Sequence, residues 1–459
     1  MRVAAALLAV TMPAAALNPG VALGVDLGTS GVRVAVVEAD GASTKILGEA
    51  ATGWSDADGR RPEVWLAALQ ETISKCDAVA RVQRISVSGT SSSTLVVDTK
   101  TGGVARAPMM YNDAVACDRA LAAIEANAPA GHTVRSATSA LAKLLAWAVE
   151  APLGADDVVC HQADFVAAAL ATGSAAGLAP RPVLESDWHN ALKMGFDVEA
   201  LRWPAWIVDG ALPAVGARPG ALAELDVLRP GAAGRRVVAA DNAWGLPAGA
   251  PIVGGTTDSI AAFLACSVDG GAVRVEPGRA VTSLGSTTAL KLVSDVKIDD
   301  AATGVYSHRL DDTWLVGGAS SAGCRVLRDF KFSDDELRTL SETLDAGATN
   351  AAGVYPLSAP GERFPFNDPR KQPVLPDAAD SDRARVLHEL LVGIADVERL
   401  GYLALKERGA TPLVSVQTAG GGARNPQWRA LREKMLGVPV LGAENSDAAF
   451  GAAALALRG

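Results

Sequence analysis

The sequence predicts an α/β protein made of two related domains. Its 459 residues match two to three domains of ordinary size, and 49% of them are hydrophobic, which is ample for large cores. A strand–turn–strand pattern occurs twice, over residues 21–38 and 280–290. The two turns share one motif, because Leu27-Gly28-Thr29-Ser30 is echoed by Leu284-Gly285-Ser286-Thr287. We therefore expect two domains, over residues 21–244 and 245–459, each with its own hairpin.

The first domain begins with that hairpin. Residues 21–26 and the Val-rich run 32–38 are expected to be strands on either side of a turn that holds Gly, Ser and Thr. Residues 62–75 follow as a predicted helix, with a proline in the first turn, where proline is tolerated. Two further strands are expected to flank the polar loop 89–93, at residues 84–87 and 95–98.

The second domain starts after the Gly- and Pro-rich loop 245–251. A short strand, the polar turn 254–259 and a helix at 260–266 are predicted there. After the hairpin of residues 280–290, the Pro- and Gly-rich stretch 347–382 predicts a long surface excursion. The remaining predicted elements are a long helix at 383–407, a strand at 413–417, a helix at about 426–436 and an Ala-rich helix at 447–457.

The balance of charges limits the partners. The chain has 42 Lys and Arg residues against 51 Asp and Glu, whereas proteins that bind the nucleic-acid backbone usually present a basic face. No apolar run reaches the roughly 18–20 residues that span a bilayer. The five cysteines are scattered, so we expect neither a disulfide framework nor a structural zinc site. We expect small-molecule partners, no nucleic acid and no membrane, and a monomer or homodimer.

Three polar turns that contain glycine each follow a predicted strand. They lie at residues 28–31, 285–288 and 420–422. Glycine lets the backbone come close to a phosphate, and successive N–H groups form an anion-binding nest. One such turn alone is typical of a plain hairpin, but three of them, two of which share a motif, favour a nucleotide site.

Two aspartates stand beside polar turns. Asp26 ends the first strand, where its carboxylate is placed to hold Mg²⁺ through water beside a triphosphate; a turn-forming aspartate is the alternative. Asp258 lies in Gly254-Gly255-Thr256-Thr257-Asp258-Ser259, at the start of a predicted helix. There it is either a helix cap or a general base that faces the substrate.

Four motifs resemble those of the FGGY carbohydrate kinases, and they occur in that family's order. They are a first phosphate loop, a catalytic-aspartate motif, a second phosphate loop and an adenosine motif: Gly24-Val25-Asp26-Leu27-Gly28-Thr29-Ser30, Gly254-Gly255-Thr256-Thr257-Asp258, Leu284-Gly285-Ser286-Thr287 and Gly420-Gly421-Gly422-Ala423-Arg424-Asn425. The resemblance covers about residues 21–459. It implies two actin-like, ribonuclease-H-type domains of the ASKHA superfamily with a cleft between them.

The resemblance also implies a role for each site residue. Asp258 would be the catalytic base, and Asp26 and Asp258 would contact the sugar and hold Mg²⁺ in its outer shell. Ser91 and Asp113 are the best candidates for further sugar contacts, because a hydroxyl and a carboxylate can both bind sugar hydroxyl groups. The implied cofactors are ATP and Mg²⁺. The residues implied in ATP binding are Gly28, Thr29, Ser30, Gly285, Ser286, Thr287, Gly421, Gly422 and Asn425.

Further stretches are similar to a short pentulose-kinase branch of the family, found in plants and cyanobacteria and associated with D-ribulose. They are residues 108–113, 186–193, 306–309, 314–320 and 363–366. Typical xylulose kinases carry Gln-Met-His after the Gly of the sugar loop, where this chain has Gly89-Thr90-Ser91-Ser92. The chain departs from the branch at Ser88, where an Asp is common. The resemblance thus implies an ATP-dependent D-ribulose kinase. The alternatives are a D-xylulose kinase and, from another class, a non-catalytic ATP-binding protein of the actin/Hsp70 type.

The first 20 residues combine a basic start, an apolar stretch and small residues, a pattern similar to a targeting segment. With the plant-like resemblance, this leads us to expect an organellar, plastid location if residues 1–20 are a targeting signal, and a cytoplasmic location otherwise. An Ala-rich extension without a targeting role is the alternative.

Overall fold

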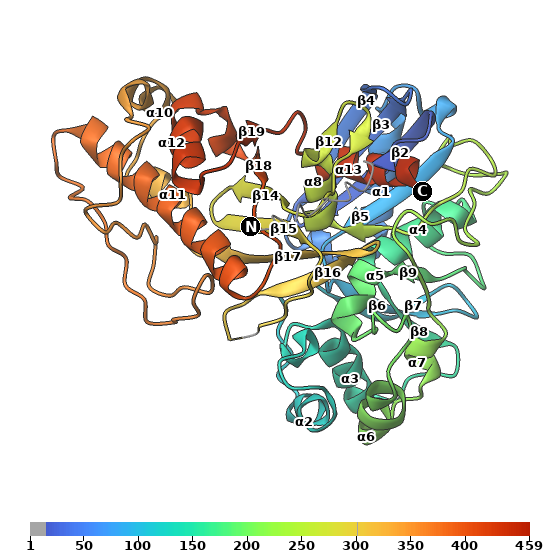
Figure 1. Ribbon diagram of the computed structural model, residues 1–459. Coiled ribbons are helices and arrows are strands. Elements are labelled where there is room, and N and C mark those ends of the chain that lie inside the picture. The colour runs from blue at the N-terminus through green and yellow to red at the C-terminus, as the bar shows by residue number, and fades with distance from the viewer. Residues whose placement is uncertain (1–14, 301) are drawn as a thin grey trace, which may run out of the picture.

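A computed structural model describes residues 15–300 and 302–459 of the chain (Figure 1). Its first large sheet has five strands in the order β11-β5-β2-β3-β4. The predicted hairpin is present as β2 (Gly20–Gly28) and β3 (Gly31–Ala39), which pair antiparallel, and β4 (Thr44–Gly53) extends it. The sheet is completed by β5 (Arg84–Gly89) and β11 (Thr256–Thr257), which run parallel to β2.

The second large sheet repeats this arrangement strand for strand. Its order is β16-β17-β15-β14-β18-β19. The hairpin of β14 (Arg279–Leu284) and β15 (Thr288–Ser294) corresponds to β2 and β3, and β17 (Thr313–Ser320) corresponds to β4. The parallel strands β18 (Ser415–Ala419) and β19 (Val440–Gly442) correspond to β5 and β11, while β16 (Tyr306–Leu310) is an additional edge strand. The repeat of two turn motifs is therefore a repeat of whole sheets, which confirms the expected pair of related α/β folds.

A third, smaller sheet follows the first in the chain. Its strands, in the order β7-β6-β8, are β7 (Val104–Met109), β6 (Thr94–Asp98) and β8 (Asp157–His161). With its helices it forms the lower lobe in Figure 1. Helix α1 (Pro62–Ser74) matches the predicted helix and packs on β3 and β4. Further helices of this half of the chain include α2 (Asp118–Asn127), α3 (Ala140–Glu150), α4 (Gln162–Thr172), α6 (Leu212–Val215) and α7 (Gly220–Ala223).

Two helices from the second half of the chain pack on the first sheet. The last helix, α13 (Ala448–Arg458), contacts β2, β3 and β5 and lies beside α8 (Asp258–Cys266); in Figure 1 the red α13 stands among blue strands. Small residues permit this approach, because a Cβ on Gly24 would collide with the backbone of α13, and one on Gly451 with the backbone of α8. The two sheets therefore do not divide the chain at one point, and the expected boundary near residue 245 stays a prediction.

The predicted helices of the second domain are present as α11 (Arg383–Glu407) and α12 (Pro426–Leu436). The short helices α9 (Arg325–Asp329) and α10 (Asp334–Thr339) precede them. Residues 347–382, all of which the structure describes, form no helix or strand, as expected. They are not confined to the surface, however, because Phe364 is buried in a cluster with residues of β15 and α11. An apolar anchor of this kind holds the excursion against the domain.

Short elements complete the fold. They are a three-stranded sheet of β1 (Ala15–Ala16), β13 (Ala272–Val273) and β12 (Val268–Asp269), a parallel pair of β9 (Glu185–Asp187) and β10 (Asp226–Leu228), and α5 (Trp188–Ala191). Of the expected targeting segment, residues 1–14 lie outside the described residues, whereas Leu17 is buried in a core cluster with α13. None of the helices in the described part of the chain is both long and apolar enough to cross a bilayer.

Candidate active site

The carboxyl ends of three parallel strands of the first sheet meet at one edge. Asp26 of β2 lies in register with Ser88 of β5, which lies in register with Thr256 of β11. Ser88 Oγ donates a hydrogen bond to Asp26 Oδ1 (2.9 Å), and Arg33 Nη2 lies 3.7 Å from Asp26 Oδ2. Asp26 is only 2% exposed, and burial raises its pKa to about 6 although the bond from Ser88 opposes this shift.

Asp258 is the first residue of α8, directly after β11, so it reaches the same edge. Its Oδ1 accepts a hydrogen bond from the Ser259 N–H (2.6 Å). Its charge contributes to the raised pKa of Asp26, so the two carboxylates lie within electrostatic reach of each other. Burial raises the pKa of Asp258 as well, and the charge of Lys291 opposes that rise. Lys291, from β15 of the other sheet, donates to Ser259 O (2.7 Å) and Ser259 Oγ (3.0 Å).

The first phosphate loop is the turn between β2 and β3. Gly28 is half-buried at its start, and Thr29 and Ser30 are exposed. Trp54 donates two hydrogen bonds to the backbone of this turn. Its backbone N–H donates to Ser30 O (3.0 Å) and its Nε1 donates to Thr29 O (2.9 Å). Trp54 thus fixes the backbone of the turn, and the hydroxyl groups of the exposed Thr29 and Ser30 are accessible to a ligand.

The two expected sugar contacts differ in their surroundings. Ser91 Oγ is buried and has no hydrogen-bond partner within the described residues. Asp113, in contrast, accepts two hydrogen bonds from Arg60, at 2.7 and 2.8 Å, and a third from the Met110 N–H (2.7 Å). The bonds from Arg60 are the largest cause of the lowered pKa of Asp113. A sugar hydroxyl at this place would therefore meet an ion pair, where the sequence predicted a single carboxylate.

The second phosphate loop is the turn between β14 and β15. Ser286 and Thr287 are exposed, and Gly285 is half-buried. The start of α9 backs the turn, since the Cys324 N–H donates to Gly285 O (2.8 Å). Arg328 Nη2 donates to Ser286 Oγ (2.6 Å), which brings a guanidinium group to the loop.

The adenosine motif lies next to this second loop because β14 and β18 are parallel and end together. Gly420 has φ +84°, and a Cβ there would lie 2.6 Å from Leu284 O, so the close approach requires glycine. Gly421 and Gly422 form a short turn before α12. Asn425 caps α12, its Oδ1 accepting a backbone N–H at 2.9 Å, and its amide nitrogen donates to a serine hydroxyl at 2.8 Å. Its side chain thus has a structural role, and its contact with adenosine stays a prediction.

The structure therefore gathers the predicted residues into three groups. They are the carboxylates with the first loop (Asp26, Asp258, Gly28, Thr29, Ser30), the sugar pair (Ser91, Asp113), whose loops are joined by a hydrogen bond, and the second loop with the adenosine motif (Gly285, Ser286, Thr287, Gly421, Gly422, Asn425). The first and third groups lie on different sheets, and Lys291 links those sheets near Asp258.

Two stretches that resemble the pentulose-kinase branch, residues 186–193 and 306–309, meet in the fold. His189 Nε2 lies 2.7 Å from Arg309 O, and His189 Nδ1 lies 2.8 Å from Thr256 Oγ1. A carbonyl oxygen only accepts, so Nε2 carries the proton and Nδ1 accepts from the threonine hydroxyl. Burial lowers the pKa of His189 to about 4, so the ring is neutral. One histidine therefore joins the edge strand of the second sheet to the strand that precedes Asp258.

The two carboxylates fit Mg²⁺. In nucleotide sites this ion keeps several waters and takes one or two carboxylates together with phosphate oxygens. Asp26 and Asp258 supply such a pair. No group of three or more His, Cys, Asp or Glu side chains gathers as a metal site in the described ranges.

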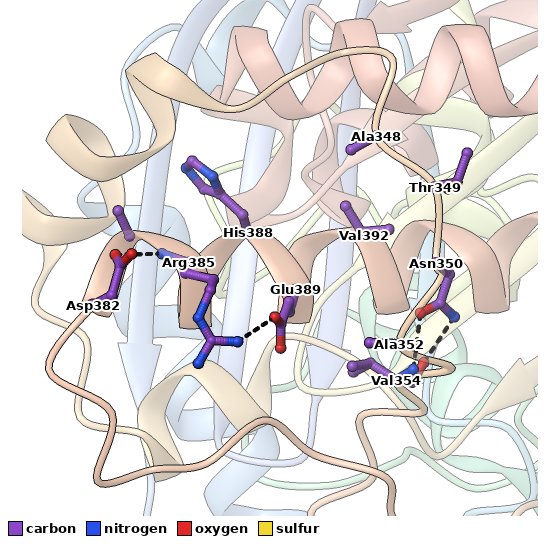
Figure 2. A pocket seen from close by; sticks show the side chains of 11 residues that line it. Ala348, Thr349, Asn350, Ala352, Val354, Asp382, Arg385, His388, Glu389 and Val392 are labelled. Atoms are coloured by element: carbon purple, nitrogen blue, oxygen red, sulfur yellow. Dashed lines mark hydrogen bonds and ion pairs between the residues drawn. The ribbon is translucent and has the colours of Figure 1, made fainter.

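A separate pocket of about 370 Å³ lies between α11 and residues 348–354 (Figure 2). Its polar groups bond to one another: Arg385 Nη1 donates to Glu389 Oε1 (2.6 Å), and Asn350 exchanges hydrogen bonds with the backbone of Val354. None of the predicted site residues lines this pocket.

Sequence reasoning missed the groups that support the loops. They are Trp54, Arg60, Lys143, Lys291 and Arg328. Each of these residues lies outside the motifs, and its distance along the chain from its hydrogen-bond partners follows no pattern that would predict the contact. Only Lys143 could have been found from the local sequence, since it is the only charged residue in the apolar run Ala140–Val149.

Residues 280–459 match the sequence model described as the FGGY family of carbohydrate kinases, C-terminal domain. This region holds the second phosphate loop, the adenosine motif and α13. The family resemblance is thus confirmed for the C-terminal part of the chain. The narrower pentulose-kinase branch and the plant-like origin stay predictions.

Solved structures of sugar kinases share the fold of nearly the whole chain. The xylulose kinase from Bifidobacterium adolescentis has a TM-score of 0.77 at 20% identity, covering 96% of this chain and 92% of that one. A xylulose kinase from Brucella ovis has a TM-score of 0.73 at 25% identity, with 95% and 89% covered. A Plasmodium falciparum glycerol kinase with ADP has a TM-score of 0.73 at 14% identity, with 95% and 88% covered. The protein therefore shares the fold of these sugar kinases over nearly its whole length, and its residues 280–459 match the C-terminal domain of the FGGY family of carbohydrate kinases.

Proposed function

We propose that the protein is an ATP-dependent sugar kinase that converts a pentulose, D-ribulose, to D-ribulose 5-phosphate. The observation that carries the proposal is the pair of carboxylates, Asp26 and Asp258, at the edge of the first sheet beside one glycine loop, with a second glycine loop on the other sheet. The family match of the C-terminal domain supports sugar kinase chemistry.

In the proposed reaction the γ-phosphoryl group moves from ATP to a sugar hydroxyl, O5 of D-ribulose. The bond between the γ-phosphorus and the bridging oxygen breaks, a new P–O bond forms to the sugar, and ADP leaves. The hydroxyl proton goes to Asp258, and general-base assistance of this kind contributes roughly 10²–10⁴ in rate. The charge of Lys291 favours the ionised form of Asp258, which is the form that accepts a proton.

The two loops would divide the triphosphate between them. Thr29 and the N–H groups of the first loop would hold the γ-phosphate, and the second loop with Arg328 would hold the others. The adenosine motif lies beside the second loop, so the base and the phosphates would be bound by one sheet. When bound, Mg²⁺ would neutralise phosphate charge, held through water by Asp26 and Asp258.

The choice of sugar depends on the loop that follows β5. Ser91 offers a buried hydroxyl without a protein partner, and Arg60 and Asp113 offer donors and acceptors together. The small polar residues 89–92, in place of the Gln-Met-His of typical xylulose kinases, support D-ribulose. D-xylulose is the second candidate, because xylulose kinases are among the solved structures with this fold.

A coupled assay of ADP release with Mg-ATP tests the proposal. D-ribulose, L-ribulose, D-xylulose, glycerol and no sugar are compared on the full chain. We expect strong turnover with D-ribulose alone. A preference for D-xylulose would retain the kinase but reassign the sugar. Tight nucleotide binding without turnover of any sugar would overturn the kinase and favour the actin/Hsp70-type alternative.

A further inference from the structure

One buried amine lies between the two loops that carry the proposed sugar contacts. Lys143, on α3, is 0% exposed. Its Nζ donates to Ser92 O (2.7 Å) and to Met110 O (2.6 Å). Ser92 directly follows Ser91, and Met110 stands three residues before Asp113. A single side chain is therefore bonded to both loops, although they are about twenty residues apart in the sequence.

The loop of Ser91 needs such support. Ser92 has φ +70°, in the left-handed region that side chains disfavour, so its conformation has to be held by its surroundings. A second bond joins the same two loops, because the Tyr111 N–H donates to Ser93 Oγ (3.0 Å). The ammonium group and this bond together fix the distance between the loops.

A charged amine at this place is unfavourable for folding alone. Burial lowers the pKa of Lys143 to about 8, and only the charge of Asp113 opposes that effect. The carboxylate of Asp113 is itself bonded to Arg60 and to the Met110 N–H, and the two hydrogen bonds of Lys143 go to carbonyl oxygens. An apolar side chain at this position would leave the Ser92 carbonyl without its donor, so the amine is best explained by the loops it binds.

We propose that Lys143 is a positioning residue for sugar binding, which fixes the loop of Ser91 against the loop of Asp113. This inference rests on the proposed function, because that function assigns both loops to the sugar. Methionine at position 143 fills a similar volume but donates no hydrogen bond, so Ser92 O loses its donor, Met110 O keeps only the Asp113 N–H, and the two sugar contacts lose their fixed separation.

The test compares Lys143→Met with Lys100→Met, a matched control at an exposed lysine of the same lobe. We expect K143M to raise the KM for the accepted pentulose about tenfold or more, and to leave the KM for ATP within about twofold. Backbone amides of residues 90–93 and 110–113 should exchange hydrogen faster, in both loops together. K100M should change none of these values.

Three outcomes test the positioning role of Lys143. An unchanged sugar KM in K143M, or equal rises of the sugar and ATP KM values, would overturn the positioning role while the proposed kinase stands. If the wild-type protein turns over no sugar, the proposed function and this inference fail together. Should K143M lose its cooperative thermal unfolding, Lys143→Gln takes its place under the same criteria, because the shorter amide cannot reach both carbonyl groups.

Discussion

The two hairpin turns of this protein have nearly the same sequence but different electrostatic surroundings. The residue two before Gly28 is Asp26, a buried acid, whereas the residue two before Gly285 is Ser283. The second turn instead receives the guanidinium group of Arg328. The first turn thus adjoins a buried carboxylate that is paired with Arg33, whereas the second adjoins a guanidinium group that is bonded to its own serine, although both turns close the same hairpin of a repeated sheet.

This difference shows how the same hairpin backbone can support two kinds of chemistry. Beside the first turn, Asp26 and Asp258 can accept a proton and hold a hydrated cation. Beside the second, an arginine and exposed hydroxyl groups can hold anionic oxygens. The repeat supplies the turns, and residues brought by neighbouring elements decide the chemistry of each turn.

The largest expected effect is on the acidic side. Asp258→Ala should lower kcat by roughly 10²–10⁴, because the sugar hydroxyl loses its proton acceptor. ATP affinity, measured by calorimetry, should stay nearly the same. Ser286→Ala serves as the matched change on the second turn, and it should weaken ATP binding more than turnover. Near-normal turnover in D258A would show that Asp258 is not the general base, and the two turns would then not differ in chemistry as described above.

A substitution at Asp26 tests how much the buried carboxylate beside the first turn lowers the free energy of unfolding. The pKa of Asp26 is about 6 in the folded protein, against an ordinary value of 3.8. Below pH 3.8 the carboxyl group is protonated in both the folded and the unfolded protein. As the pH rises through 6, the folded protein loses the stability that the protonated carboxyl group contributes. Asp26→Asn should therefore be more stable than the wild type above pH 6, by up to about 3 kcal/mol, with the difference closing towards pH 4.

Urea unfolding without nucleotide or metal measures this difference. Asp40→Asn is a control of opposite sign, since hydrogen bonds from the backbone N–H groups of Ala42 and Ser43 lower the pKa of Asp40. That exposed variant should be less stable than the wild type at neutral pH. A D26N protein with no gain at pH 8 would contradict the assignment of Asp26 as a buried, strained acid.

The basic side is tested by Arg328→Gln. Loss of the guanidinium group should raise the KM for ATP about tenfold with a smaller change in kcat, since a charge-assisted hydrogen bond is removed from the phosphate contacts. Arg325→Gln, on the same short helix, is the control. An unchanged KM for ATP in R328Q would mean that Arg328 only supports Ser286.

The smallest expected change concerns the backbone of both turns. A Cβ at Gly28 would meet its nearest atom at 3.6 Å and one at Gly285 at 3.7 Å, which are ordinary contacts. Gly28→Ala and Gly285→Ala should each change the free energy of unfolding by no more than about 0.5 kcal/mol. A loss of ATP affinity in either variant would then report the close approach of a phosphate. Unchanged affinity in one of them would identify that turn as a plain hairpin.

Local patterns determined much of this fold from the sequence alone. The helix predicted at 383–407 is α11 and that at 426–436 is α12, because helical periodicity and capping residues act within a few turns. Asp447 caps the last helix as its position indicated, with Oδ1 accepting the Ala449 N–H at 2.8 Å. The two hairpins were equally visible, since glycine-bearing turns between β-branched runs are signals of short range.

Only the tertiary structure decided what surrounds the motifs. The sequence places Asp113 as a lone carboxylate, but the fold brings Arg60 onto both of its oxygens, and it places Lys143 between two loops. The fold also lays α13 on the first sheet, far from its neighbours in the chain. Secondary structure follows from interactions among near neighbours, whereas ion pairs and buried amines join residues whose separation along the chain carries no pattern. For this reason the sequence predicted which turns are candidates for ligand binding, and the fold decided which charges each turn meets.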